Sequence, residues 1–196
     1  MQTSKQLPLF NPIASNEFYD CIAIDPPWQY DARVNDKTHR GRMDYPTMPI
    51  KDILALSVNQ LAADNAVLWL WVTNSFLQEG FQCLDAWGFQ YKTVLTWVKM
   101  SSKGTPHIGL GNWLRNATEQ CLFAVKGDVK SFSKQGILKG DANVIFAPRR
   151  EHSRKPEEFY ELVSKLSPEG KKLEMFSRQR REGWDVWGLE VDKFSA

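Results

Sequence analysis

The chain has 196 residues, of which 42% are hydrophobic and 24% charged, and we expect it to form a single domain over 1–196 with an N-terminal extension at 1–17. Its three cysteines show no paired spacing and its three histidines are scattered, which argues against a disulfide framework and against a metal site. No signal peptide is evident and no apolar run approaches the roughly 18 residues of a membrane helix, so we expect a cytoplasmic protein without a membrane segment.

The formal net charge is only +2, but it is unevenly distributed along the chain. The segment from Lys126 to Arg181 holds 14 Lys and Arg against 8 Asp and Glu. A basic segment of this kind is typical both of a solvated protein face and of a nucleic-acid-binding surface. Charge alone does not distinguish the two.

Short apolar runs rich in β-branched and aromatic residues recur along the chain. Most are continuous rather than alternating, as in strands that are buried on both faces of a sheet. We therefore predict seven strands, at 21–25, 66–73, 93–99, 120–126, 143–147, 172–177 and 184–189.

Amphipathic stretches between these runs predict three helices that face the core. They cover 49–65, then 75–88 with Phe81 on its apolar stripe, and 154–170 with Pro156 in its first turn. Strands that alternate with helices favour a mainly parallel sheet, which binds ligands beyond the carboxyl ends of its strands. Polar or glycine-bearing segments are the expected site loops, at 29–48, 100–117 and 127–142.

The stretch DPPW at 25–28 directly follows the first predicted strand. Asp25 offers a carboxylate, and Pro26 offers a backbone carbonyl on a segment restricted by its own ring and by Pro27. Two fixed acceptors would hold both N–H groups of an exocyclic base amine and direct its lone pair at an incoming methyl group, while Trp28 would stack on an extruded base. The alternative is a strand-ending turn with Trp28 in the core.

This tetrad resembles the catalytic motif of the MT-A family of S-adenosylmethionine-dependent adenine-N6 methyltransferases, and the resemblance runs from about 19 to 191. It implies an α/β fold with a Rossmann-like class I methyltransferase sheet of seven mostly parallel strands and helices on both faces. The order is circularly permuted, because the catalytic motif precedes the cofactor strand. Further similar stretches follow in the family's order, namely YPTM (45–48), LWLWVT (68–73), WGF (87–89), WVK (97–99), GNWLRNATEQCLFAVKG (111–127), HSRKPEEFYELVSKLSP (152–168) and LEMFSR (173–178).

The resemblance also implies roles for individual residues. Asp25, Pro26, Pro27 and Trp28 would be catalytic, and substrate contacts are implied for Trp28, Tyr45, Arg40, Arg42, Glu119 and Asn116. Cofactor contacts are implied for Asp25, Lys155, Glu174, Phe176, Arg178, Arg180, Arg181 and Glu190. Lys155 could instead be a solvated helix-start lysine, Asn116 a turn cap, and the arginines phosphate contacts or a solvated turn. One departure is Leu189, which stands where the family has a polar residue. Glu190 alone would then supply the polar contact at that end of the cofactor pocket.

The segment 29–48 is basic and lies beside the tetrad, where phosphate contacts would make affinity fall with salt. Small members of this family usually act on DNA, which is therefore the expected substrate, with RNA as an alternative. Cytosine-N4 methylation and a non-catalytic nucleic-acid-binding scaffold are further alternatives. We expect no separate target-recognition domain, so specificity would come from the chain's own loops or from a partner, either a second copy or a different chain.

Overall fold

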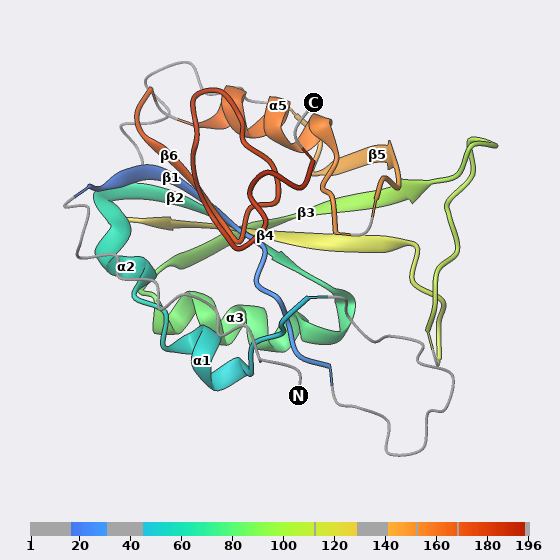
Figure 1. The fold of residues 1–196 in the computed structure, drawn as a ribbon, viewed down its shortest axis with the longest axis horizontal. Helices are drawn as coiled ribbons and strands as arrows, with labels where there is room; N and C mark the ends of the chain where they lie inside the picture. The colour runs from blue at the N-terminus through green and yellow to red at the C-terminus, as the bar shows by residue number, and fades with distance from the viewer. Residues whose placement is uncertain are drawn as a thin grey trace.

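In the computed structural model, which describes residues 17–30, 45–111, 113–128, 141–151, 153–167 and 169–194, the strands form one sheet. The sheet has seven strands in the order β5-β3-β4-β2-β1-β6-β7 (Figure 1). Only β4 runs against the others, since it pairs antiparallel with β2 and β3 and all other pairs are parallel. The predicted seven-stranded, mostly parallel sheet is therefore confirmed. The strands are β1 (Tyr19–Ile24), β2 (Ala62–Val72), β3 (Gln90–Met100), β4 (Thr118–Lys126), β5 (Val144–Pro148), β6 (Lys172–Met175) and β7 (Asp185–Trp187).

Helices cover both faces of the sheet, as predicted (Figure 1). On one face lie α1 (Ile50–Leu54), α2 (Val58–Leu61) and α3 (Leu77–Ala86), which follows the 3-10 helix η2 (Asn74–Phe76); α5 (Glu157–Leu166) covers the other face. The sheet therefore separates two cores, one with Ile53 and Leu84 and one with Phe159 and Trp71. None of the helices in the described ranges is long and apolar enough to span a membrane.

Two of the three predicted helices differ from the sequence-based expectation. The stretch 49–65 splits into α1 and α2, and its last residues begin β2, because Ala62 pairs with Tyr19 and Ala66 with Lys126 in the sheet. Strand pairing here overrides a weak helical preference. In α3, Phe81 lies on the exposed side against Tyr91, and the buried side is formed by Gly80, Cys83 and Leu84.

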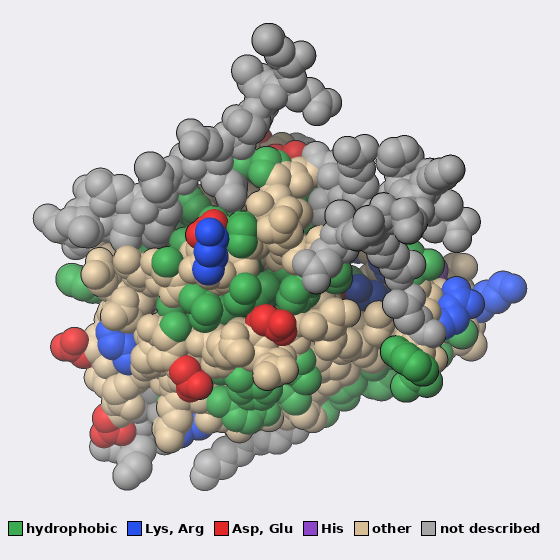
Figure 2. Space-filling model, turned by 90° about the horizontal axis from the view of Figure 1, so that it is seen from below, with side chains coloured by type: hydrophobic (Ala, Val, Ile, Leu, Met, Phe, Trp, Pro, Cys, Tyr) green, Lys and Arg blue, Asp and Glu red, His purple; other side chains and the backbone are tan. Residues whose placement is uncertain are grey.

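Gly80 explains how closely α3 approaches the sheet. A Cβ atom at this position would lie 2.6 Å from Cγ1 of Val72 on β2. The third predicted helix is confirmed as α5, although Pro156 precedes the helix as its N-cap. Figure 2 views the molecule from the side of α1 and α3, where hydrophobic side chains alternate with isolated acidic ones and the described residues form no continuous basic surface.

The register of β1 and β6 determines where the candidate site lies. These two strands are neighbours and parallel, and Ile24 at the end of β1 pairs with Met175 at the end of β6. The tetrad and the segment that begins with Phe176 therefore leave the sheet side by side. Residues about 150 positions apart in sequence meet at the carboxyl edge, where open α/β sheets bind ligands.

Candidate active site

The tetrad forms a tight turn held by three hydrogen bonds. Trp28 N donates to Pro26 O over 2.8 Å, an i to i+2 contact of the γ-turn type, and Met48 N donates to Pro27 O over 2.8 Å. The indole Nε1 of Trp28 donates to Trp71 O over 3.2 Å. The turn is thus fixed to β2 and to the segment before α1. Pro26 O still has a second lone pair with which to accept another hydrogen bond.

Trp28 does not present the open stacking face that the sequence analysis expects. Its side chain is only 5% exposed, and one face stacks on the ring of Phe76, with centroids 5.3 Å apart. The alternative, in which Trp28 is a core aromatic, describes this arrangement better. The exposed aromatic beside it is Tyr30, which meets Phe76 edge-on and whose hydroxyl lies 2.8 Å from Oγ1 of Thr73.

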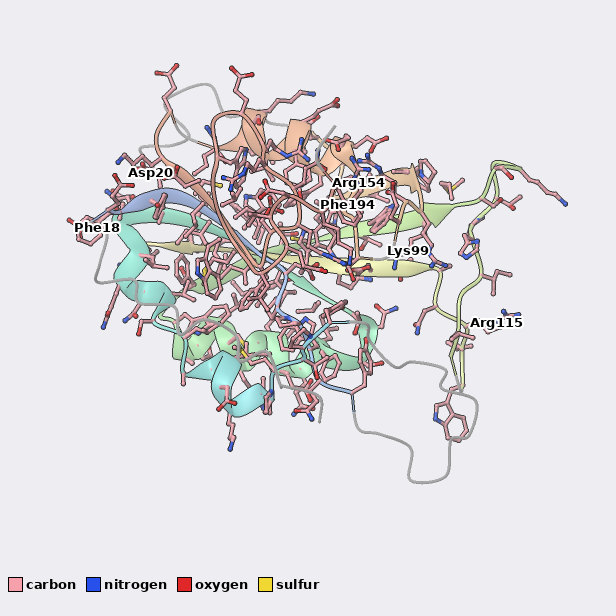
Figure 3. All side chains as sticks on the ribbon, viewed as in Figure 1. Phe18, Asp20, Lys99, Arg115, Arg154 and Phe194 are labelled. Atoms are coloured by element: carbon pink, nitrogen blue, oxygen red, sulfur yellow. The ribbon has the colours of Figure 1, made fainter. Side chains whose placement is uncertain are left out.

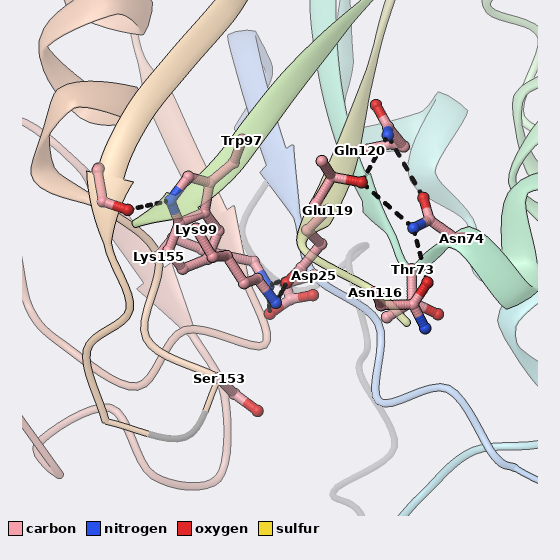
Figure 4. A network of polar contacts seen from close by, with 12 residues as sticks. Asp25, Thr73, Asn74, Trp97, Lys99, Asn116, Glu119, Gln120, Ser153 and Lys155 are labelled. Atoms are coloured by element: carbon pink, nitrogen blue, oxygen red, sulfur yellow. Dashed lines mark hydrogen bonds and ion pairs between the residues drawn. The ribbon is translucent and has the colours of Figure 1, made fainter. Parts of the chain in front are cut away.

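Asp25 is the first member of a chain of four alternating charges (Figure 4). Lys155 Nζ lies 2.8 Å from Oδ2 of Asp25 and 2.5 Å from Oε1 of Glu119, whose Oε2 lies 2.7 Å from Lys99 Nζ. Lys99 and Glu119 come from the paired strands β3 and β4, and Lys155 lies just before α5. Lys155 and Glu119 are buried, whereas Asp25 keeps 29% of its side chain exposed.

Burial and the two lysines affect the two carboxylates differently. Burial raises the pKa of Asp25, and the attraction of Lys155 only partly offsets it. Burial also opposes ionisation of Glu119, but Lys155 and Lys99 together outweigh it and lower the pKa of Glu119 to about 2. Desolvation disfavours the charge on Lys155, yet the two carboxylates raise its pKa above the ordinary lysine value. Lys155 is therefore a fixed cation at neutral pH and does not act as a base.

An open, shallow cavity begins at Asp25 and extends along the segment after β6. Six residues with predicted site roles line it, namely Asp25, Lys155, Glu174, Phe176, Arg178 and Arg181. The other lining residues are Ser153, Arg154, Tyr160, Gln179 and Phe194. Arg154 and Phe194 lie against each other at this cavity, with the guanidinium 5.2 Å from the ring centre (Figure 3).

Glu174 lies on β6 with both carboxylate oxygens engaged. Tyr160 Oη donates to Oε1 over 2.6 Å, and Ser177 Oγ donates to Oε2 over 2.9 Å. Burial raises the pKa of Glu174, and these two hydrogen bonds only moderate the effect. The next residue but one, Phe176, has φ of +60°, an unfavourable backbone conformation for an aromatic residue, and it packs on Trp187.

The three predicted cofactor arginines have different surroundings. Arg178 pairs with Glu190 over 2.7 Å and lies over the rings of Tyr45 and Phe194. Arg181 lies over the ring of Tyr160 at 3.5 Å from its centre and pairs with Glu157. Arg180 pairs with Asp192, and since both side chains are 65% exposed, Arg180 lies outside the cavity. Glu190 pairs with Arg178, which lines the cavity, but is not itself among the lining residues, and Leu189 is exposed.

The predicted substrate residues are spread around this region. Tyr45 is half-buried, and its hydroxyl lies 3.2 Å from Oγ of Ser153, which lines the cavity. Asn116 lies at the base of the β3–β4 connection, where its side chain accepts a hydrogen bond from Asn74 Nδ2. Arg40 and Arg42 lie outside the described residues.

Several residues that the structure brings to the site have no predicted role. Lys99 completes the charge chain, and its signal was a charged residue at the WVK ending of an apolar predicted strand. Tyr160, Arg154 and Phe194 reach the cavity through tertiary packing, for which the sequence gives no local signal. Within the part of the chain that the structure describes, no group of His, Cys, Asp and Glu is arranged to hold a metal ion.

Comparison with known proteins identifies the chain's relatives. It is 30% identical over 193 residues to the type II methyltransferase M.MunI from Mycoplasma sp, covering 88% of this chain and 78% of that protein. It is 31% identical over 175 residues to the human N(6)-adenosine-methyltransferase catalytic subunit METTL3, covering 87% of this chain but 28% of METTL3. The Arabidopsis thaliana N(6)-adenosine-methyltransferase MT-A70-like is also 31% identical, over 89% of this chain and 24% of that protein.

The chain thus spans only about a quarter of the two N(6)-adenosine methyltransferases, but most of M.MunI. The MT-A70 family matches residues 19–190, which include the tetrad, the charge chain and most of the cavity lining. The chain belongs to the MT-A70 family.

Proposed function

We propose that this protein transfers a methyl group from S-adenosylmethionine to the exocyclic N6 amine of adenine in nucleic acid, with DNA as the preferred polymer. The observation that carries this proposal is the position of Asp25. Its carboxylate lies past the end of β1, at the mouth of the cavity, with Oδ2 bound by Lys155 and 29% of the side chain open. The names of the N(6)-adenosine methyltransferases among the relatives support the same target atom.

Asp25 and Pro26 supply the hydrogen-bond acceptors in this mechanism. The lone pair of an adenine amine is delocalised into the ring, so the amine attacks well only when its two N–H groups are held. Asp25 accepts one N–H, and Pro26 O accepts the other with its remaining lone pair. As the new N–C bond forms, the nitrogen becomes more acidic, and a carboxylate beside it stabilises the developing positive charge. One N–H proton then leaves, with Asp25 as its first acceptor.

The residues that line the cavity suit the proposed cofactor, which would supply the electrophilic methyl group when it is bound. Glu174 would accept hydrogen bonds from ribose hydroxyls with the lone pairs that Tyr160 and Ser177 leave free, and Phe176 and Phe194 would pack against an adenine. The buried Nε atoms of Arg154 and Arg181 have no hydrogen-bond partner among the described residues, so two donors remain for an anionic group such as the amino-acid carboxylate.

The choice of DNA over RNA rests on the chain's similarity to M.MunI over most of that protein. RNA stays the second candidate, because METTL3 and the plant protein are named for adenosine. A cytosine-N4 activity would use the same two acceptors. The intact tetrad and charge chain argue against a scaffold that has lost catalysis.

The location and assembly of the protein remain part of the proposal. All three cysteines are buried free thiols, which supports a reducing compartment such as the cytoplasm. The β3–β4 connection projects from the sheet (Figures 1 and 3) and exposes Ile108, Leu110, Leu114 and Trp113, the last of these 98% exposed. An apolar projection of this kind supports contact with a second copy or a partner chain. Sedimentation of the purified protein would measure its oligomeric state.

One assay tests the proposed activity. Purified protein with labelled S-adenosylmethionine is offered adenine-containing DNA and RNA oligonucleotides side by side, and the labelled base is identified after digestion. We expect N6-methyladenine in DNA, and a loss of at least about 100-fold in Asp25→Ala, because an acceptor made for the transition state is removed. Asp85→Ala, an exposed change on α3, is the control. Full activity of Asp25→Ala would exclude this mechanism.

A further inference from the structure

Lys155 is shared between the proposed catalytic carboxylate and a second carboxylate that the proposed mechanism does not use. Its ammonium contacts Asp25 on one side and Glu119 on the other, at 2.8 and 2.5 Å. Its Nζ also lies 5.0 Å from the ring centre of Trp71, a cation–π contact that stabilises the charged form. The ammonium is therefore held from several directions in a buried place.

Glu119 is the better fixed of the two carboxylates. It lies within β4, where its backbone pairs with Trp97 of β3, and its second oxygen is bound by Lys99. Lys99 is placed in turn by β3 and lies 4.9 Å from the ring centre of Trp97. Asp25 and Lys155 lie in connecting segments after β1 and before α5. The rigid part of the charge chain is thus the Lys99–Glu119 pair.

The consequence for Asp25 is that its two oxygens are not equivalent. Lys155 contacts Oδ2, and no hydrogen bond from the described residues reaches Oδ1. A lysine with only one carboxylate partner is free to move between both oxygens of that carboxylate, since an ammonium group is a compact point charge with three donors. Attraction to Glu119 opposes that movement and keeps Lys155 on the Oδ2 side.

We propose that Glu119 is a positioning residue for the methyl transfer: with Lys99 behind it, Glu119 anchors Lys155 on Oδ2 of Asp25 and thereby leaves Oδ1 to accept the N–H of the target amine. This inference rests on the proposed function and assigns Glu119 a role in the same site. Glu119 itself is buried behind Lys155, so it acts through Lys155 and does not touch the substrate amine.

Glu119→Gln tests this role because glutamine keeps the size of the side chain and one acceptor but removes the charge. Lys155 then has Asp25 as its only anionic contact and moves fully onto it. We expect kcat to fall about 10- to 100-fold, while the affinity for S-adenosylhomocysteine changes less than about 2-fold. Glu119→Asp, which keeps the charge, should recover part of kcat.

The pH dependence separates positioning from a structural defect. Loss of the Glu119 charge removes its direct repulsion of the Asp25 carboxylate and leaves Lys155 to favour the ionised form, so both effects lower the pKa of Asp25 and move the acid limb of kcat to lower pH. Lys99→Met removes a positive charge near Asp25 and should move the limb to higher pH. The other titratable groups that interact with Asp25 are unchanged in these variants, namely Tyr30, Tyr45, Cys121, Tyr160 and Glu174.

The decisive measurement does not depend on catalysis. The carboxyl carbon of Asp25, labelled with ¹³C and assigned by comparison with Asp25→Asn, is titrated by NMR in wild type, Glu119→Gln and Lys99→Met. Glu161→Gln, an exposed change on α5, is the matched control and should leave the titration in place. Opposite shifts in the two site variants support the inference.

Two results would overturn it, and they are distinguishable from each other. An Asp25 titration that is the same in wild type and Glu119→Gln excludes coupling through Lys155, whether or not the protein methylates nucleic acid. If the Asp25 titration differs between wild type and Glu119→Gln but the wild-type protein methylates neither DNA nor RNA, the coupling exists and the proposed function is excluded. Glu119 then has no role in methyl transfer.

Discussion

The ring of Trp28 stacks on the ring of Phe76, with centroids 5.3 Å apart and planes inclined by 15°. Trp28 is the last residue of the DPPW tetrad, and Phe76 ends the 3-10 helix η2. The indole also donates to Trp71 O, so the tetrad is attached to the sheet by one hydrogen bond and one aromatic contact of the same side chain. In this structure Trp28 supports the turn that carries Asp25.

We expect Phe76→Ala to weaken both the fold and the catalysis. Removal of a half-buried stacked ring should lower the free energy of unfolding by about 2 kcal/mol and reduce kcat, since the turn loses its support. Urea unfolding and steady-state methylation measure the two effects. Phe81→Ala, which removes an edge-on contact with Tyr91 on the outer side of α3, should leave kcat unchanged. Equal kcat in wild type and Phe76→Ala would show that this contact does not support the tetrad.

The affinity for the cofactor should weaken in acid because of Glu174. Burial raises the pKa of this carboxyl above its ordinary value, so Glu174 takes up a proton at a higher pH than an exposed glutamate and then ceases to be a charged acceptor. Calorimetry with S-adenosylhomocysteine should show affinity that falls as pH drops toward that raised pKa. Glu174→Gln should bind about 10- to 100-fold more weakly at neutral pH, without this pH dependence. If Glu174→Gln keeps the wild-type pH dependence of affinity, Glu174 is not the group that causes it.

Arg180 and Arg181 are adjacent in sequence but should behave differently when replaced by alanine. Arg181 lies over Tyr160 and pairs with Glu157 at the cavity, so Arg181→Ala should lower stability by about 1 kcal/mol and cofactor affinity by about 10-fold. Arg180 forms an exposed pair with Asp192, and its replacement should change neither quantity measurably. Thermal unfolding and calorimetry compare the two variants. If the two variants lose the same stability and the same cofactor affinity, Arg181 does not contribute to the cavity more than Arg180 does.

The strands were predictable because burial on both sheet faces leaves a mark in the sequence. In β2, seven consecutive residues from Ala66 to Val72 are buried, and such a run has few other interpretations. The prediction of one helix over 49–65 was wrong. The apolar spacing of this stretch fits a helix, but its last residues pair with β1 and β4 as the start of β2. Propensity contains no information about a partner strand.

Residues that line the candidate site were predictable where a sequence motif marks them, whereas the contacts between them depend on strand register and were not. Asp25 could be identified from its place after a buried strand. The link from Lys99 through Glu119 to Lys155 depends on which residues of β3 and β4 face each other and on where α5 begins. The burial of Trp28 could not be predicted either, because an aromatic residue after a strand is compatible with both a stacking surface and a core position.

The pairing of β1 with β6 has a consequence for synthesis on the ribosome. β2 follows β1 within about fifty residues and can pair with one edge of β1 early in synthesis. The other edge of β1 stays unpaired until β6 has been translated. During that interval the backbone of Cys21–Ile24 presents unsatisfied groups to any neighbouring extended peptide. A nascent chain arrested before residue 172 would therefore lack the cavity-lining residues of β6 and of the segment after it. It would also expose an unpaired strand edge that can aggregate.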